Sequence, residues 1–131
     1  MKNDKIKVVT YLRVASNNDK ELVNKENEMM KLINKHENDW VVVAQYEDIG
    51  CSGRKFDREG LSNLFEKLDD VDMVVTLSPQ MIARDVLVYK NIYQKIESKK
   101  CTLYIRDVHH ENVPKRAVKL DLFTKSNVVF A

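Results

Sequence analysis

The segment from Ile6 to Ser16, IKVVTYLRVAS, constrains the fold of this chain more than any other stretch. It is rich in β-branched and aromatic residues, which is typical of a strand buried on both faces of a sheet. Arg13 stands at the end of this apolar run, and a polar turn follows it. In open α/β sheets, ligands bind at the carboxyl ends of the strands. A guanidinium there predicts either an anion site, most simply for phosphate, or an ordinary surface ion pair.

Three further strands alternate with helices along the chain. Apolar runs predict strands over 40–46, 72–77 and 102–106, and apolar residues at helical spacing predict helices over 19–36, 58–68 and 88–96. This alternation favours an α/β fold with a mainly parallel central sheet and helices on both faces. The length of 131 residues suits one domain over 1–131, with its core at about 5–108 and no separate DNA-binding domain. Residues 109–131 combine a proline, mixed charges and a final apolar run, and this pattern predicts no definite element.

Composition and charge argue against several classes of protein. The formal net charge of +2 gives no broad electrostatic footprint for nucleic acid. The two cysteines, Cys51 and Cys101, are too few for a disulfide framework, and with the three histidines they show no zinc-binding spacing. No apolar run is long enough for a signal peptide or a membrane-spanning helix. We therefore expect a cytoplasmic protein with no metal, no cofactor and no membrane partner.

Polar and basic residues lie where successive strands end. Tyr11 and Arg13 belong to the end of the first strand, Asp48 follows the second and Arg84 follows the third. Arg58 begins the helix after a loop that holds two of the three glycines of the chain. Because the carboxyl ends of parallel strands share one edge, we expect the three arginines to converge. Convergent arginines suit phosphoryl transfer, where they stabilise charge on the non-bridging oxygens. The alternative is three independent surface arginines.

Three segments resemble motifs of the serine recombinases, the family of resolvases and invertases. YLRVAS at 11–16 resembles the Y-x-R-V-S-T opening of the family. DIGCSG at 48–53, with REGL at 58–61, resembles the D-x-G-x-S-G and R-P-G-L segments. LSPQMIARD at 77–85 resembles the stretch that carries D/S-R-L-x-R. The resemblance covers about residues 5–110, with the motifs in the order of the family.

This resemblance implies an α/β catalytic domain that breaks DNA by transesterification without a metal or other cofactor. In the family, a serine hydroxyl attacks a phosphodiester and forms a phosphoserine link to DNA, while arginines stabilise the transition state. By resemblance, the phosphate-binding residues are Tyr11, Arg13, Arg58 and Arg84. Asp48 matches the aspartate that opens the glycine loop.

Three positions depart from the pattern of the family. Ala15 stands where the nucleophilic serine belongs, and a methyl group cannot attack phosphorus. Gln80 and Met81 stand where the family commonly has Asp or Ser and then Arg. Loss of one transition-state donor typically lowers the rate ~10²–10³-fold. Ser16 is the only nearby substitute nucleophile, but a shift of one residue at a strand end turns the side chain the other way.

Three interpretations follow. The first is a cleavage-inactive recombinase-like domain, a pseudoenzyme of a mobile genetic element, that acts in site-specific recombination as a regulatory or dimerisation partner. The second is an active DNA-cleaving recombinase that uses Ser16. The third is a protein-interaction module with an idle phosphate site. For the first we expect a homo-oligomer, or a hetero-oligomer with an active recombinase. We also expect weak or indirect DNA contact, because no element that reads base edges can be identified.

Overall fold

The computed structural model describes residues 5–15, 17–50 and 58–109. Their strands form one fully parallel sheet in the order β2-β1-β3-β4, with β1 (Ile6–Val14), β2 (Trp40–Ile49), β3 (Met73–Thr76) and β4 (Thr102–Ile105). β1 pairs with β2 on one side and with β3 on the other. It is buried along almost its whole length, which confirms the strand predicted from its apolar run.

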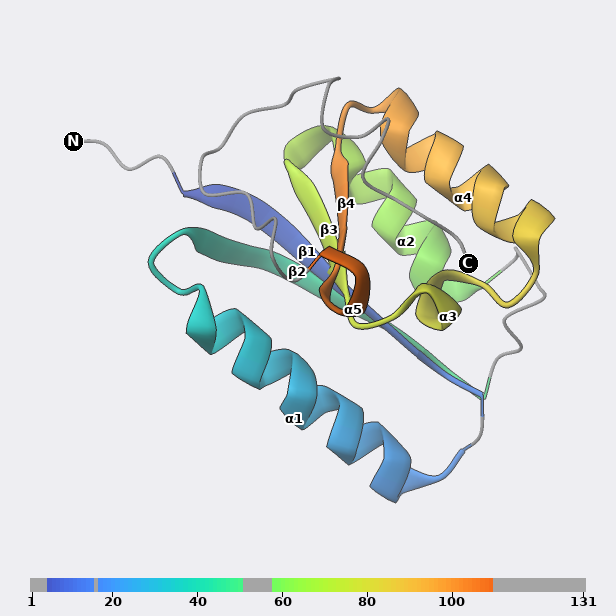
Figure 1. Cartoon of the computed structure of the whole chain (residues 1–131). Helices are drawn as coiled ribbons and strands as arrows, with labels where there is room; N and C mark the ends of the chain where they lie inside the picture. Colours follow the sequence, from blue (N-terminus) through green and yellow to red (C-terminus); the bar gives the residue numbers. More distant parts are fainter. Residues whose placement is uncertain (1–4, 16, 51–57, 110–131) are drawn as a thin grey trace.

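Helices cover both faces of this sheet (Figure 1). α1 (Asp19–Lys35) packs on one face, and α2 (Glu59–Lys67) and α4 (Val86–Ser98) pack on the other. The described part of the chain also has three shorter helical segments: η1 (Leu68–Asp70), α3 (Pro79–Ile82) and α5 (Arg106–His109). The predicted α/β fold, with a mainly parallel central sheet and helices on both faces, is thereby confirmed.

β1 supplies side chains to two separate cores, because successive residues of a strand point to opposite faces of the sheet. Val9 and Tyr11 pack against α2 and α4, where the buried apolar residues include Leu61, Leu64, Ile92 and Ile96. Val8 and Leu12 pack on the other face, where α1 contributes Met29 and Leu32. Burial of each such side chain stabilises the fold by ~1.5–3 kcal/mol, so β1 holds the two layers together.

The clearest differences from the sequence-based element boundaries concern β2, α3 and α5. β2 continues beyond residue 46 to Ile49, because it stays paired with β1 as far as Val14. The polar turn after β3 contains α3, which begins with Pro79, a residue favoured in the first turn of a helix. The chain after β4 forms the single turn α5. Residues 51–57, which include most of the glycine loop, and residues 110–131 of the unassigned segment 109–131 lie outside the described residues.

Candidate functional site

The site lies at the carboxyl ends of β1 and β2, where α2 begins. Asp48 stands opposite Arg13 in the β1–β2 register. Its buried carboxylate accepts hydrogen bonds from the backbone N–H groups of Gly60 (2.7 Å) and Leu61 (3.0 Å). Arg58, at the N-cap position, makes no side-chain cap of its own. Asp48 therefore caps α2 from the neighbouring strand, at the helix end that favours negative charge.

Gly60 allows β2 and α2 to approach this closely. A Cβ atom at this position would lie 2.5 Å from the carbonyl oxygen of Glu47 and 2.9 Å from Oδ2 of Asp48. The first of these atoms belongs to the backbone and cannot move aside without shifting β2. The glycine of the REGL segment thus brings the first turn of α2 within hydrogen-bond distance of the Asp48 carboxylate.

Tyr11 connects Asp48 to Arg58 inside the protein. Its hydroxyl donates a hydrogen bond to Oδ2 of Asp48 over 2.6 Å and accepts one from Nη1 of Arg58 over 3.1 Å. The Arg58 guanidinium also lies 5.9 Å from the centre of the Tyr11 ring, at cation–π distance. Burial, together with the hydrogen bond to Asp48, raises the pKa of Tyr11 well above its ordinary value. The hydroxyl therefore stays protonated and remains a donor at neutral pH.

Two arginines of the site donate to the backbone of α3. Arg58 donates from Nη1 to the carbonyl oxygen of Met81 over 3.4 Å, and from Nη2 to that of Ile82. Arg13 donates from Nη2 to the carbonyl oxygen of Gln80. The last carbonyl groups of a helix have no acceptor role inside it, so these guanidiniums cap α3. Arg58 is only 2% exposed and Arg13 only 5%, so both cations are buried at this helix end.

The remaining predicted site residues lie around this group. Ala15 directly follows β1 and is exposed. Gln80 is exposed as well, whereas Met81 is buried and its sulfur accepts a hydrogen bond from a backbone N–H of β1 over 3.3 Å. Arg84 is exposed, and no hydrogen bond or ion pair joins it to any residue of the described part of the chain. Ser16 lies outside the described residues.

Three of the predicted residues, Tyr11, Asp48 and Arg58, thus form one hydrogen-bonded group. Arg13 contacts α3, the short helix that Arg58 also contacts. A pocket of about 420 Å³ opens beside this group. Asp48, Arg58, Glu59 and Asn63 line it together with residues of β2. The acceptor role of α3 was not predicted, because backbone carbonyls leave no residue-type signal in a sequence.

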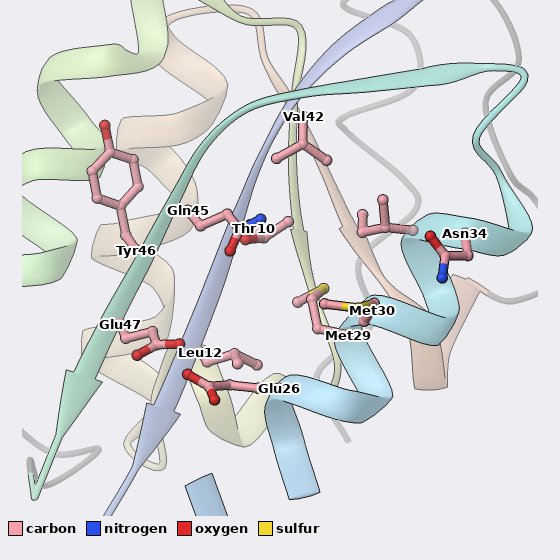
Figure 2. Close-up of a pocket in the computed structure, with 11 residues that line it drawn as sticks. Thr10, Leu12, Glu26, Met29, Met30, Asn34, Val42, Gln45, Tyr46 and Glu47 are labelled. Carbon is pink, nitrogen blue, oxygen red and sulfur yellow. The ribbon is translucent and has the colours of Figure 1, made fainter. Parts of the chain in front are cut away.

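A pocket of about 390 Å³ lies on the other face, between α1 and the β1–β2 pair (Figure 2). Leu12, Met29 and Met30 give it an apolar wall. Glu26 of α1 and Glu47 of β2 lie at one end of it, and their carboxyl groups share a hydrogen bond. Burial, followed by the hydrogen bond and the charge of Glu26, raises the pKa of Glu47 to about 7. This pair was not predicted, because the spacing of the two residues along the chain does not reveal that they face each other.

We expect this carboxyl pair to make stability fall as the pH rises. The folded protein retains a proton on Glu47 up to about pH 7, whereas the unfolded chain loses it near the ordinary pKa of 4.5. The folded state therefore binds more protons between these values, so the free energy of unfolding decreases through this window and levels off above it. Water screens the partly exposed pair, so we expect a decrease of about 1 kcal/mol.

Urea unfolding at about pH 5 and about pH 8 measures this decrease. Glu47→Gln keeps a hydrogen-bonding group but does not titrate, so it should remove the decrease. Glu37→Gln changes an exposed glutamate of the α1–β2 connection and serves as the control. A decrease of equal size in both variants would contradict the assignment to Glu47.

Within residues 5–15, 17–50 and 58–109, no group of three or more His, Cys, Asp or Glu side chains is placed to hold a metal ion. None of the described helices combines the length and the apolar character needed to cross a membrane.

A protein-family model matches almost the whole chain. Residues 8–125 match the model described as "Resolvase, N terminal domain". The chain belongs to the resolvase family. This confirms the resemblance predicted from the three motifs, and the matched range of this resolvase-family chain includes Tyr11, Asp48 and Arg58. No curated protein matches it.

Solved structures of serine recombinases share the fold. The C-terminal catalytic domain of ISC1926 TnpA, an IS607-like serine recombinase, is 25% identical over 76% of this chain and 70% of that one, with a TM-score of 0.66. The N-terminal catalytic domain of TP901-1 integrase is 21% identical over 77% and 78%, with a TM-score of 0.70. A resolvase family site-specific recombinase from Streptococcus pneumoniae is 24% identical over 79% and 74%, with a TM-score of 0.62. This resolvase-family chain is a serine-recombinase-like domain related to site-specific recombination.

Proposed function

We propose that this resolvase-family domain takes part in site-specific DNA recombination without cleaving DNA, as a regulatory or dimerisation partner of an active recombinase. The observation that carries the proposal is Ala15, which is exposed directly after β1 where the family motif has its nucleophilic serine. Alanine has no hydroxyl group and cannot form the phosphoserine link. Met81 adds to this, because a buried thioether occupies the position of an arginine that would stabilise the transition state.

The framework around these positions supports a role that depends on the fold. Tyr11, Asp48 and Arg58 are hydrogen-bonded to one another, and Asp48 also caps α2. These contacts lock the carboxyl ends of β1 and β2 to α2 and α3. A domain that keeps this framework keeps the fold through which it would contact a recombinase or DNA.

A second candidate function is a protein-interaction module whose phosphate site is idle. The hydrogen bonds of Arg58 favour this second function. Its guanidinium is buried and donates to Tyr11 and to two carbonyl groups of α3. A phosphate would have to compete with these acceptors. The two candidates are distinguished by adding the chain to a full-length serine recombinase bound to its recombination site. A further retardation of the DNA complex in a gel supports the first, and binding to the recombinase only when DNA is absent supports the second.

The chain alone should form no covalent adduct with DNA. We expect no protein–DNA band on a denaturing gel, and no nicked or linear product, after incubation with supercoiled plasmid that carries candidate recombination sites. Ala15→Ser should also be inactive, because Gln80 and Met81 still lack the acidic and guanidinium groups of the family. Loss of one such donor typically lowers the rate ~10²–10³-fold.

An adduct that Ser16→Ala abolishes would overturn the proposal in favour of an active enzyme that uses Ser16. Ser62→Ala, at an exposed serine of α2, is the matched control for loss of a hydroxyl group. Cleavage restored by Ala15→Ser alone would show that the residues at positions 80 and 81 are dispensable for the chemistry.

A further inference from the structure

A small pocket of about 210 Å³ lies between α1, β4 and α5. It is on the opposite flank of α1 from the Glu26–Glu47 pair, because the two pockets use different helical faces. None of its lining residues belongs to the group around Asp48. The lining residues are Glu28, Lys31, Leu32, Lys35, His36, Tyr104 and Arg106.

Basic side chains dominate the rim of this pocket. Lys31 and Lys35 are exposed and one helical turn apart, so they lie on the same face of α1. Neither lysine side chain forms a hydrogen bond or an ion pair with another residue in the described ranges. Their positive charge is therefore uncompensated within this part of the chain.

The other charges of the pocket are already paired. Arg106 Nη1 lies 3.0 Å from Oε1 of Glu28, and its Nε lies 2.8 Å from Oδ1 of Asp107. Burial opposes ionisation of Glu28, but the hydrogen bond from Arg106 and the charge of Lys25 keep the pKa of Glu28 below its ordinary value. The single carboxylate of the lining is thus committed to Arg106 and does not neutralise the two lysines.

The wall of the pocket carries the hydroxyl group of a largely buried tyrosine, and this hydroxyl reaches the solvent. Tyr104 is only 2% exposed and packs edge-on against Trp40, with ring centres 5.5 Å apart. Its hydroxyl makes no hydrogen bond with any residue that the structure describes. Burial raises the pKa of Tyr104 even though Arg106 opposes the shift, so the hydroxyl is a proton donor at neutral pH. A ligand with acceptor oxygens in the pocket would accept a hydrogen bond from it in place of water.

We propose that this pocket binds a phosphate group, held by Lys31, Lys35 and the Tyr104 hydroxyl. A phosphate presents negatively charged acceptor oxygens in several directions, which suits donors that arrive from two elements. The volume accommodates a phosphate with a few waters, since a water occupies about 30 Å³ of the liquid. The phosphate is either a free phosphate compound or a backbone phosphate of DNA that passes over α1. The site is separate from the arginines at α3 and does not depend on the proposed function.

The test is a titration of the full chain with inorganic phosphate, monitored by the NMR chemical shifts of the backbone amides. The ionic strength is held constant, and chloride is the reference salt. We expect saturating shifts at 31–36 and 104–106. The variant with Lys31→Gln and Lys35→Gln should bind phosphate roughly tenfold more weakly, because charge-assisted hydrogen bonds are the strong ones. Tyr104→Phe removes only the hydroxyl and should weaken binding several-fold.

A double variant with Lys67→Gln and Lys90→Gln makes the same change in net charge on α2 and α4, and should leave the affinity unchanged. Shifts confined to 78–84, shifts that never saturate, or equal loss of affinity in both double variants would overturn the proposal. A short DNA duplex distinguishes the two sources of phosphate. If the duplex shifts the same amides and displaces inorganic phosphate, the site binds DNA. If the duplex leaves the shifts caused by inorganic phosphate unchanged, the site binds a free phosphate compound.

Discussion

Replacement of Arg58 by methionine is expected to lower the free energy of unfolding by about 3–5 kcal/mol. Arg58→Met keeps much of the side-chain volume but removes the guanidinium group. The carbonyl oxygens of Met81 and Ile82 then lose a donor, and the Tyr11 hydroxyl loses one as well. The carboxylate of Asp48 stays buried without the nearby positive charge. Removal of one charge from a buried group is severe because the remaining charge is left uncompensated.

Arg84→Met is the matched control, because Arg84 is exposed and makes no hydrogen bond with the described residues. Surface substitutions of this kind usually change stability by less than about 0.5 kcal/mol. Urea unfolding followed by circular dichroism measures both variants at neutral pH. If Arg58→Met loses no more stability than Arg84→Met, then Arg58 does not hold the fold together, and its guanidinium is available to a ligand.

Asp48→Ala should cause the second large loss, about 3 kcal/mol. The backbone N–H groups of Gly60 and Leu61 and the hydroxyl of Tyr11 all donate to this carboxylate inside the protein. An unsatisfied buried donor costs ~1–3 kcal/mol, and alanine leaves these donors without an acceptor. The start of α2 would lose its cap at the same time.

Asp85→Ala offers a close comparison for this measurement. Asp85 caps α4 in a similar way, since its carboxylate accepts from the backbone N–H groups of Leu87 (2.8 Å) and Val88 (3.2 Å). It is partly exposed, so water can replace the lost acceptor, and we expect a loss of about 1 kcal/mol. Equal losses in Asp48→Ala and Asp85→Ala would show that Asp48 is an ordinary helix cap without a wider structural role.

The fold was predictable because buried positions must be occupied by apolar residues, and their spacing can be read from the sequence. A strand covered on both faces must be apolar at successive positions, and the segment that became β1 has this property. Element ends were less predictable. The end of β2 depends on pairing with β1 as far as Ile49, and α3 is a single turn in a polar segment. Such short elements depend on tertiary contacts that periodicity does not report.

The candidate site was predictable only in part. The rule that parallel strands end at one edge correctly placed Arg13 beside Asp48. It did not indicate what the arginines bind, because their partners at α3 are backbone carbonyl groups. The Glu26–Glu47 pair was missed for a related reason. Its formation depends on the position of α1 across the sheet, which spacing along the chain does not determine.

Arg13 and Arg58 hold α3 through contacts that do not involve the side chains at positions 80 and 81. Substitutions at these two positions therefore leave these contacts of the fold in place. Both arginines bind main-chain carbonyls, which every amino acid provides, so this anchorage does not depend on the side chains at positions 80 and 81. Gln80 faces water, and Met81 has to satisfy the core rather than the arginines. A lineage can therefore exchange reactive side chains for inert ones at these two positions by single substitutions and still inherit a foldable domain. Because the arginines bind the backbone of α3, a domain with this fold can lose catalytic side chains at α3 and keep the contacts that hold α3 in place.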